Sequence, residues 1–268
     1  MQRLILGLIL LAFPFHLVAM PAPAGCDSHF LDGEMPDIAV ALAPQTQVVC
    51  FSAFAVLHSG VTKTPLWSAE RLTPASVASA TQLTRPSSGP FHAESKLPTA
   101  QRATLNDYRG TGFDRGHMAP SGNMPTKTAQ IESFSLANIV PQQACNNEET
   151  WEGIESGLRK FVSSGEEVFV ITGPVFDPSF PPPAGATIGQ GVAVPTRLFK
   201  AVYVVGAGTG AAYLTTNIDT TEFSQVSFAE MQAVTGIDLF PKLAVAIKQT
   251  AAALPPPSPP SHRCRLRR

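Results

Sequence analysis

The sequence has little charge and no excess of either sign. Only 15% of its 268 residues are Asp, Glu, Lys or Arg, and the formal net charge is −1 with a pI near 6.6. A protein whose whole surface attracts phosphate needs a clear basic excess, so that class of nucleic-acid binder is excluded. Any polyanion that this protein binds must be held by a local cluster of basic residues.

Cysteine is scarce as well, and none of the four cysteines lies in a C-x-x-C pair. This spacing argues against a cysteine zinc site. Four thiols allow three disulfide connectivities, and the sequence does not choose among them. Our preferred pairing is Cys26 with Cys50, which ties the N-terminal segment to the first strand, and Cys145 with Cys264, which anchors the C-terminal tail.

Long apolar runs are missing except at the N-terminus. There one arginine precedes an apolar stretch that Pro14 and His16 interrupt and that leads into Ala22-Pro23-Ala24. The stretch is too broken for a membrane span, and its end is typical of a secretory signal peptide (residues 1–24) cleaved near Ala24. A lipoprotein acylated at Cys26 is the weaker alternative, because Pro23 stands where a branched apolar residue is expected.

The signal peptide predicts an exported protein, periplasmic or secreted, with no stable membrane association after cleavage. Export to an oxidising compartment favours disulfides. No internal repeat or change of composition marks a linker, so residues 25–254 are expected to form one domain. Residues 255–268, P-P-P-S-P-P-S-H-R-C-R-L-R-R, are expected to form an extended, proline-rich tail with a basic end.

Strands dominate the expected core. Runs of β-branched, aromatic and other apolar residues predict strands at 48–57, at 66–72 and at 167–172, where the last runs into a turn at Gly173-Pro174. A hairpin is expected from 198–205 and 211–216. Residues 73–108 are rich in Ser, Thr, Pro and Gly and predict long surface loops around short elements.

Three helices are expected around these strands. The first follows Asn146, which stands three residues before Glu149 as in a capping box, and it continues at helical spacing to Phe161. The others span 228–234, stopped by Gly236, and 243–254. The sequence therefore predicts an α+β fold with a central antiparallel or mixed sheet flanked by helices.

The densest group of reactive side chains is F-D-R-G-H-M-A-P, residues 113–120. Arg115 disfavours the cationic form of His117, so the imidazole is expected to stay neutral near physiological pH and to accept a proton from water. Gly116 allows a backbone conformation or a close approach that a side chain would block. A loop histidine bonded to a neighbouring carbonyl is the alternative interpretation.

A second group follows on the first expected helix. Asn147, Trp151 and Glu155 are spaced by four residues and share one helix face. An Asn amide oxygen and a Glu carboxylate are hard ligands that Mg²⁺ accepts, so we expect Asn147 to bind the ion directly and Glu155 to hold one of its waters. The alternatives are a helix cap for Asn147 and an ion pair of Glu155 with Arg159. Trp151 is expected in the core.

These two groups, the octet and the helix face, occur in order with N-I-V-P-Q at 138–142 and V-I-T-G-P-V-F at 170–176. In these motifs and their order the sequence resembles the DNA/RNA non-specific endonuclease family. That family includes mitochondrial endonuclease G and secreted bacterial nucleases of the ββα-metal fold. The similarity extends from about residue 51 to 240. It also includes D-Y-R-G-T-G-F before the octet, V-A-V-P-T-R-L-F-K at 192–200 and T-G-I-D-L-F-P at 235–241.

The resemblance implies a role for each motif residue. His117 matches the general base, Asn147 the single direct magnesium ligand, Glu155 the acid that orients the metal's water shell, Arg115 the arginine that stabilises phosphate charge, and Asn138 an asparagine that supports His117 or the substrate. Asp114 is expected to fix the loop through backbone hydrogen bonds. Some relatives use a further arginine from an earlier strand, for which Arg71 is our candidate.

One position departs from the family. Relatives often carry a smaller side chain or a histidine at Arg197, and the sequence leaves open whether strand packing or substrate contact changes.

The resemblance thus implies an exported Mg²⁺-dependent endonuclease that hydrolyses DNA and RNA, with Mn²⁺ or another divalent ion as the alternative cofactor. Little sequence preference is expected, because metal and arginine bind phosphate and not base edges. One alternative is an exported, non-catalytic nucleic-acid or phosphate-binding protein of the same fold. Another is a structural protein, in which His117 and Asn147 would lie on opposite faces. The oligomeric state stays open, a homodimer included.

Overall fold

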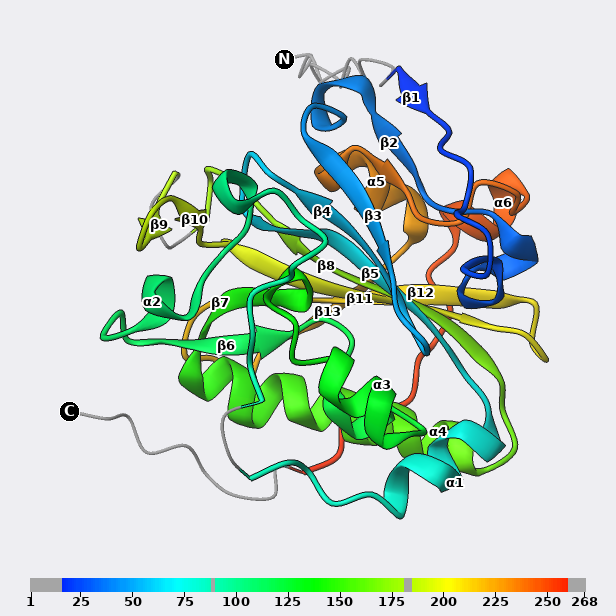
Figure 1. The fold of residues 1–268 in the computed structure, drawn as a ribbon. Coiled ribbons are helices and arrows are strands. Elements are labelled where there is room, and N and C mark those ends of the chain that lie inside the picture. The colour runs from blue at the N-terminus through cyan, green and yellow to red at the C-terminus, as the bar shows by residue number, and fades with distance from the viewer. Residues whose placement is uncertain (1–15, 88–89, 181–184, 260–268) are drawn as a thin grey trace, which may run out of the picture.

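The computed structural model describes residues 16–87, 90–180 and 185–259. Seven antiparallel strands form its central sheet, in the order β13-β12-β11-β8-β5-β4-β3 (Figure 1). Their bounds are β3 (Thr46–Cys50), β4 (Ala55–Ser59), β5 (Thr64–Leu72), β8 (Val168–Val175), β11 (Arg197–Val204), β12 (Thr209–Thr216) and β13 (Ser224–Val226). The predicted α+β class with an antiparallel core is confirmed.

Alternating side chains give the sheet two faces, each with its own apolar core. On β11, Phe199 and Ala201 belong to the core on one face, and Leu198 and Val202 belong to the core on the other. The helix α5 (Phe228–Thr235) contributes to the first core. The helices α4 (Glu152–Ser163) and α1 (Pro74–Thr81) contribute to the second core, on the opposite side of the sheet (Figure 1).

The remaining strands and α-helices are short. They are β1 (Leu17–Val18), β2 (Asp37–Ala39), α2 (Leu105–Tyr108), β6 (Phe113–His117), α3 (Lys127–Glu132), β7 (Ile139–Gln143), β9 (Thr187–Ile188), β10 (Val192–Ala193), β14 (Ile237–Asp238) and α6 (Val245–Gln249). The strands β6 and β7 pair with each other. They precede α4 in the chain, so strand, strand and helix form a ββα unit on the α4 side of the sheet (Figure 1).

The strand at 66–72 and the hairpin of 198–216 are confirmed, as β5 and as β11 with β12. The single strand expected over 48–57 is wrong. Between β3 and β4 the chain turns, and the Phe51 N–H donates to the Phe54 carbonyl at 2.9 Å. The two rings stack with centroids 4.5 Å apart, and residues 51–54, F-S-A-F, contain no Gly, Pro, Asn or Asp, the strongest turn signals.

The turn expected at Gly173-Pro174 is wrong, because the strand β8 continues through these residues to Val175. The strand β5 pairs with β8 only as far as Thr172, so beyond this residue one edge of β8 lacks that partner and tolerates a proline. A Cβ atom on Gly173 would lie 2.5 Å from the Leu66 carbonyl oxygen. The glycine therefore serves close packing and not a turn.

The first predicted helix is confirmed, but it begins differently. A π-helical segment, η7 (Asn146–Trp151), precedes α4 and has no side-chain cap at its start. The expected capping box is wrong, because Asn146 is fully buried and its side chain is used elsewhere. It accepts a hydrogen bond from Gln142 at 2.8 Å and donates one to Thr215 at 3.2 Å.

The end of α5 at Gly236, with a left-handed φ of 72°, confirms the predicted stop. The helix expected over 243–254 is wrong in length, because α6 ends at Gln249 and the chain beyond it has no regular secondary structure. Leu254 instead exchanges two hydrogen bonds with the Gln225 side chain, and the Ser258 N–H donates to the Gly153 carbonyl at 2.8 Å. The start of the proline-rich tail thus docks along α4, while residues 260–268 lie outside the described residues.

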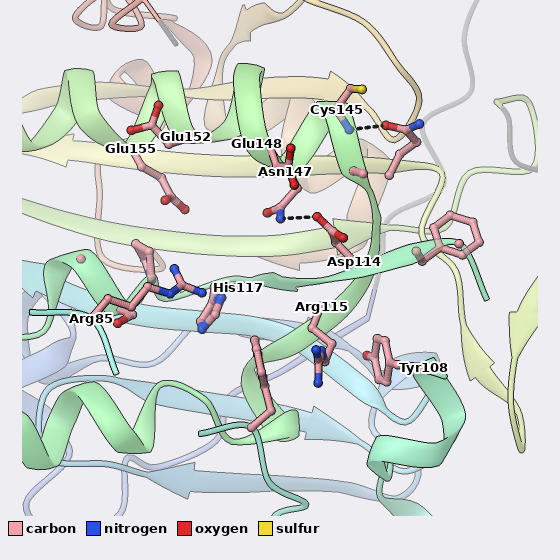
Figure 2. A pocket seen from close by; sticks show the side chains of 18 of the residues that line it. Arg85, Tyr108, Asp114, Arg115, His117, Cys145, Asn147, Glu148, Glu152 and Glu155 are labelled. Carbon is pink, nitrogen blue, oxygen red and sulfur yellow. Dashed lines mark hydrogen bonds between the residues drawn. The ribbon is translucent and has the colours of Figure 1, made fainter. Parts of the chain in front are cut away.

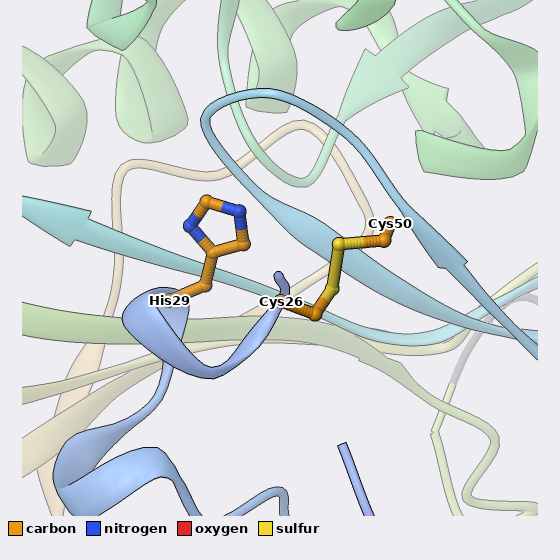
Figure 3. Close-up of side chains that lie close together, drawn as sticks. All are labelled: Cys26, His29 and Cys50. Atoms are coloured by element: carbon orange, nitrogen blue, oxygen red, sulfur yellow. A yellow bond between two sulfur atoms is a disulfide. The ribbon is translucent and has the colours of Figure 1, made fainter. Parts of the chain in front are cut away.

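One of the two expected disulfides is confirmed. Cys26 and Cys50 are bonded with their Cα atoms 5.8 Å apart, and the bond ties the N-terminal segment to β3. The other expected pair, Cys145–Cys264, includes Cys264, which lies outside the described residues. His29 lies beside the bonded pair, with its ligand atom and both sulfurs within 4.8 Å of one another (Figure 3). Because the two sulfurs are bonded to each other, they are not thiolates that could hold a metal.

Residues 1–15 of the predicted signal peptide lie outside the described residues. Its last residues include β1, which pairs with β2 through Leu17 and Ala39. Among the described residues, no helix is both long enough and apolar enough to cross a membrane.

Candidate active site

A cleft of about 1110 Å³ opens between the β6–β7 pair and the helix that follows it (Figure 2). It brings together five of the residues singled out from the sequence, which are Asp114, Arg115, His117, Asn147 and Glu155. Its lining does not include Arg71, Asn138, Gly116 or Trp151. His117 and Asn147 share one cleft, which argues against a structural protein that holds them on opposite faces.

The strand β6 orients three of these side chains. Successive side chains of a strand point to opposite sides, so Arg115 and His117 share one side and Asp114 lies on the other. Arg115 pairs with Pro141 and His117 with Ile139 of β7. A Cβ atom on Gly116 would lie 2.0 Å from the Gln142 side-chain oxygen, so the close approach expected at this glycine is present.

His117 is buried among aromatic rings. Its ring centroid lies 4.9 Å from that of Phe134 and 5.3 Å from that of Phe91, and its Nε2 is buried without a hydrogen-bond partner among the described residues. Burial, together with the nearby Arg85 and Arg115 guanidinium groups, lowers the pKa of His117 to about 3. The imidazole is therefore neutral at physiological pH and can accept a proton.

Asn147 is held by an acid from the facing strand. Its Nδ2 donates a hydrogen bond to Oδ2 of Asp114 at 3.0 Å (Figure 2). An ionised carboxylate only accepts hydrogen bonds, so the amide nitrogen must face Asp114 and the amide oxygen is left for another partner. The role expected for Asp114, bonding to the loop backbone, thus differs from what it does here, which is to orient a side chain on the neighbouring helix.

Glu155 points from α4 into the same cleft (Figure 2). Its Oε1 is buried and has no hydrogen-bond partner in the described part of the chain. Burial raises its pKa, while the charges of Lys200 and Arg159 act in the opposite direction. The ion pair of Arg159 is formed with Glu152, at 3.9 Å, and not with Glu155 as one interpretation had it.

The oxygens of Asn147 and Glu155 fit a hard divalent cation. Both residues line the cleft, one is an amide and the other a carboxylate, and a buried oxygen without a partner calls for a cation, a water or a substrate group. Mg²⁺ binds with few protein ligands and keeps several waters. The cleft therefore supplies the donors that such an ion requires.

Basic residues gather in the cleft although the whole chain is near neutral. Besides Arg115 the lining includes Arg85, Arg109 and Arg159. The Arg115 guanidinium lies over the Phe91 ring at 4.3 Å and that of Arg85 over the Phe134 ring at 5.2 Å, so each stacks on a ring that also contacts His117. The lining also includes four acids, so the local anion site is formed by the two guanidinium groups beside His117 and not by the cleft as a whole.

Arg85 is a cleft residue that sequence patterns do not reveal. It lies in a loop, in L-T-R-P, where no periodic pattern or motif singles it out. Arg71, the candidate chosen instead, pairs with Glu167 at 2.8 Å and stacks on Phe169 outside the cleft. The structure therefore does not support Arg71 as a substrate-binding residue.

Asn138 is fully buried, and its amide forms all four of its possible hydrogen bonds. Its Oδ1 accepts from Ser68 and from the Ala119 N–H, and its Nδ2 donates to the carbonyls of Ala119 and Ser133, all within 2.9 Å. No donor or acceptor is left for a substrate. Asn138 instead fixes the backbone two residues after His117.

Trp151 and Arg197 lie outside the cleft lining and contribute to packing. Trp151 is 1% exposed and belongs to the core on the α4 face, as expected. Arg197 pairs with Asp177 at 2.6 Å and stacks on Phe180 at 4.1 Å. Of the two consequences left open for Arg197, the structure favours strand packing, because the residue does not line the cleft.

Comparisons with known proteins agree with this geometry. The family model for DNA/RNA non-specific endonuclease matches residues 37–246. Nuclease C1 of Cunninghamella echinulata var. echinulata is 33% identical over 196 residues, which cover 67% of this chain and 77% of the relative. Mitochondrial endonuclease G of Bos taurus is 31% identical over 196 residues, covering 70% and 64%.

Mitochondrial nuclease EXOG of Homo sapiens is 29% identical over 220 residues, covering 74% of this chain and 58% of the relative. The chain thus spans less than two thirds of these two mitochondrial proteins. Among solved structures, that of the EndoG/EndoGI complex, described as showing the mechanism of EndoG inhibition, matches with a TM-score of 0.68 at 26% identity. The match covers 76% of this chain and 89% of that chain.

Proposed function

The chain belongs to the DNA/RNA non-specific endonuclease family and is a hydrolytic nuclease, and from this premise we propose that it is an exported, Mg²⁺-dependent endonuclease of DNA and RNA. The family consists of nucleases that depend on a divalent metal. The observation that carries the proposal is that a buried imidazole and a carboxylate oxygen, neither hydrogen-bonded within the described part of the chain, line one cleft beside two guanidinium groups.

In the proposed reaction His117 is the general base. Its neutral ring takes a proton from a water molecule as that water attacks the phosphorus in line with the leaving 3′-oxygen. The aromatic rings of Phe91 and Phe134 fix the plane of the imidazole, and burial keeps it unprotonated. General base catalysis of this kind contributes about 10²–10⁴-fold to the rate.

The phosphate is held by charge. Arg85 and Arg115 flank His117, so their guanidinium groups are placed to offset the negative charge that grows on the phosphorane oxygens. Asn147 would hold the divalent ion through its amide oxygen, and Glu155 would orient water around it. When bound, the ion acts as a Lewis acid on the phosphate and relieves charge on the leaving oxygen.

These contacts also set the substrate range. Arginine and a divalent ion bind phosphate oxygens, which every nucleotide presents, and they do not read base edges. We therefore assign both DNA and RNA as substrates, with little sequence preference. The near-neutral net charge of −1 limits long-range attraction, so we expect non-specific binding to be weak at high salt.

Nicking of supercoiled plasmid and cleavage of a single-stranded RNA, each with Mg²⁺, Mn²⁺ or EDTA, test the proposal. Cleavage of both substrates with Mg²⁺, abolished by EDTA, is the expected result. Activity that persists in EDTA would refute the metal dependence. Binding without cleavage under either cation would favour the non-catalytic alternative.

Export is tested separately. When the full chain is produced in a bacterium with a Sec system, the protein outside the cytoplasm should begin at or near Gly25, because the small residues before it form the expected cleavage site. N-terminal sequencing of that fraction gives the answer. Full-length protein confined to the cytoplasm would refute the exported localisation.

A further inference from the structure

A lysine lies where the sheet should present an apolar residue. On β11 the side chains of Leu198 and Val202 pack in the core beneath α4, and Lys200 lies between them on the same face, 1% exposed. Burying an ammonium group is costly unless it is paired and hydrogen-bonded. Lys200 therefore has a task that a leucine or valine would not perform.

The ammonium group contacts both halves of the cleft. Its Nζ donates to the Met118 carbonyl at 3.3 Å, directly after His117, and it lies 5.1 Å from the centroid of the Trp151 ring, four residues after Asn147. It thus reaches the residue directly after the strand that carries the imidazole, and the helical segment that carries the amide. The Thr172 hydroxyl, on the neighbouring strand β8, accepts a third contact at 2.8 Å and fixes the direction of the lysine.

Two acids lie near enough to act on the buried lysine. Burial lowers the pKa of Lys200, and the charges of Glu155 and Glu70 act in the opposite direction. Glu70 is 1% exposed, and its Oε1 accepts a hydrogen bond from Asn123 at 2.9 Å. Glu155 is the carboxylate of the cleft itself. The lysine is therefore joined to the catalytic machinery by geometry and by charge.

We propose that Lys200 is a positioning residue that sets the distance and orientation between the His117 strand and the Asn147 helix. This inference rests on the proposed function, because it assigns those two side chains to one reaction. Lys200 does not line the cleft. It acts through the Met118 carbonyl and the Trp151 ring, so its loss displaces the imidazole and the helix relative to each other.

The test compares Lys200→Met, which keeps an unbranched chain, with Lys200→Met/Glu70→Gln. The single variant leaves Glu70 buried without its cation and is expected to melt at a lower temperature than wild type. The double variant removes both charges and should recover much of that loss. Lys160→Met, at an exposed position on α4, is the matched control and should behave as wild type.

Three quantities are measured for each variant: the melting temperature, kcat and KM on plasmid DNA with Mg²⁺, and the dissociation constant of Mn²⁺ by electron paramagnetic resonance. If Lys200 positions the two halves, the double variant regains melting temperature while kcat stays at least about 10-fold low and KM changes little. The Mn²⁺ dissociation constant rises about 10-fold, as is usual when support behind a metal ligand is removed.

Recovery of kcat together with the melting temperature would overturn the proposal, because Lys200 would then be only the counter-charge of Glu70. Should neither Lys200 variant fold, Thr172→Val decides, since it leaves every charge in place and removes the hydroxyl that aims Nζ. An unchanged kcat and Mn²⁺ affinity in Thr172→Val would contradict the positioning role. Absence of cation-dependent cleavage in wild type would refute the proposed function instead. The positioning role of Lys200 would then be tested by the Mn²⁺ dissociation constants of the variants alone.

Discussion

Asp114 of β6 accepts a hydrogen bond from the Asn147 amide at 3.0 Å and thereby links the first strand of the ββα unit to its helix. The bond determines which end of the amide faces the cleft. An Asn that is free to rotate would present its NH₂ group to a cation half of the time, whereas this one presents oxygen. In the proposed function, this pairing orients the Asn147 amide for a metal ion before the ion binds.

Replacing that acid should weaken metal binding. In Asp114→Asn the new amide can accept or donate, so the Asn147 amide is no longer fixed in one orientation. We expect the Mg²⁺ concentration that gives half-maximal cleavage to rise about 10-fold, the usual effect of losing a partner that orients a metal ligand. Asp219→Asn, at an exposed position, is the control. Equal Mg²⁺ dependence in the two variants would show that the hydrogen bond has no such effect.

Substitutions of Arg85 and of Arg71 should have different effects on kcat/KM. Arg85 lies close enough to His117 to lower its pKa, while Arg71 is engaged by Glu167 outside the cleft. We expect Arg85→Ala to reduce kcat/KM by about 10²-fold, as for the loss of one preorganised donor to a transition-state oxyanion. Arg71→Ala should leave kcat/KM near that of wild type. Similar losses in both variants would place the substrate differently from our proposal.

The free energy of unfolding should depend on pH through His117. The pKa of this residue is about 3 in the folded protein, against 6.5 for an unperturbed histidine, so between these values the unfolded chain binds a proton that the folded one does not. Stability is therefore lost as the pH falls from about 6.5 toward 3, by about 1.4 kcal/mol per pH unit.

Urea unfolding at pH 7 and pH 5 measures this effect. Other buried groups also titrate, with His58 shifted in the same direction and Glu70 in the opposite one, so the comparison of wild type with His117→Gln isolates the contribution of one residue. The decrease from pH 7 to pH 5 should be smaller in the variant. A decrease of the same size would mean that His117 is not buried as a neutral ring.

The docked tail gives a test of the fold itself. A Cβ atom on Gly157 of α4 would lie 2.5 Å from the Pro256 carbonyl oxygen, so Gly157→Ala should push the tail away and destabilise the protein. Helix propensity alone predicts the reverse, a gain of about 1 kcal/mol. Thermal unfolding of the variant, with and without residues 255–268, separates the clash with the tail from the gain in helix propensity. The alanine should stabilise only the truncated chain. Stabilisation of the full chain would show that the tail does not dock there.

Much of the fold could be predicted from local patterns. The hairpin of β11 and β12 and the stop of α5 at Gly236 follow from apolar runs and from the conformational freedom of glycine. The errors occurred where tertiary contacts prevail over local signals. The turn between β3 and β4 is built from stacked phenylalanines, and residues 250–254 have a helical composition but are held by Gln225.

The candidate site could be predicted only in part, because the sequence shows local spacing but not tertiary contacts. His117 and Arg115 lie two residues apart on one strand, and Asn147 and Glu155 lie on one helical segment, so sequence spacing suffices to group each pair. Arg85 comes from a distant loop, and only the folded chain brings it to the imidazole. Lys200 looked like part of an ordinary strand, because alternation alone does not reveal which face carries the site.

The most direct test of the account is the rate of phosphodiester hydrolysis by His117→Ala against wild type, with saturating Mg²⁺ and on both DNA and RNA. With the general base removed, the rate should fall by at least about 10²-fold on each substrate. Circular dichroism and Mn²⁺ affinity should stay close to those of wild type, because the imidazole neither completes the sheet nor holds the ion. A folded His117→Ala protein that cleaves at the wild-type rate would contradict the assignment of His117 as the base.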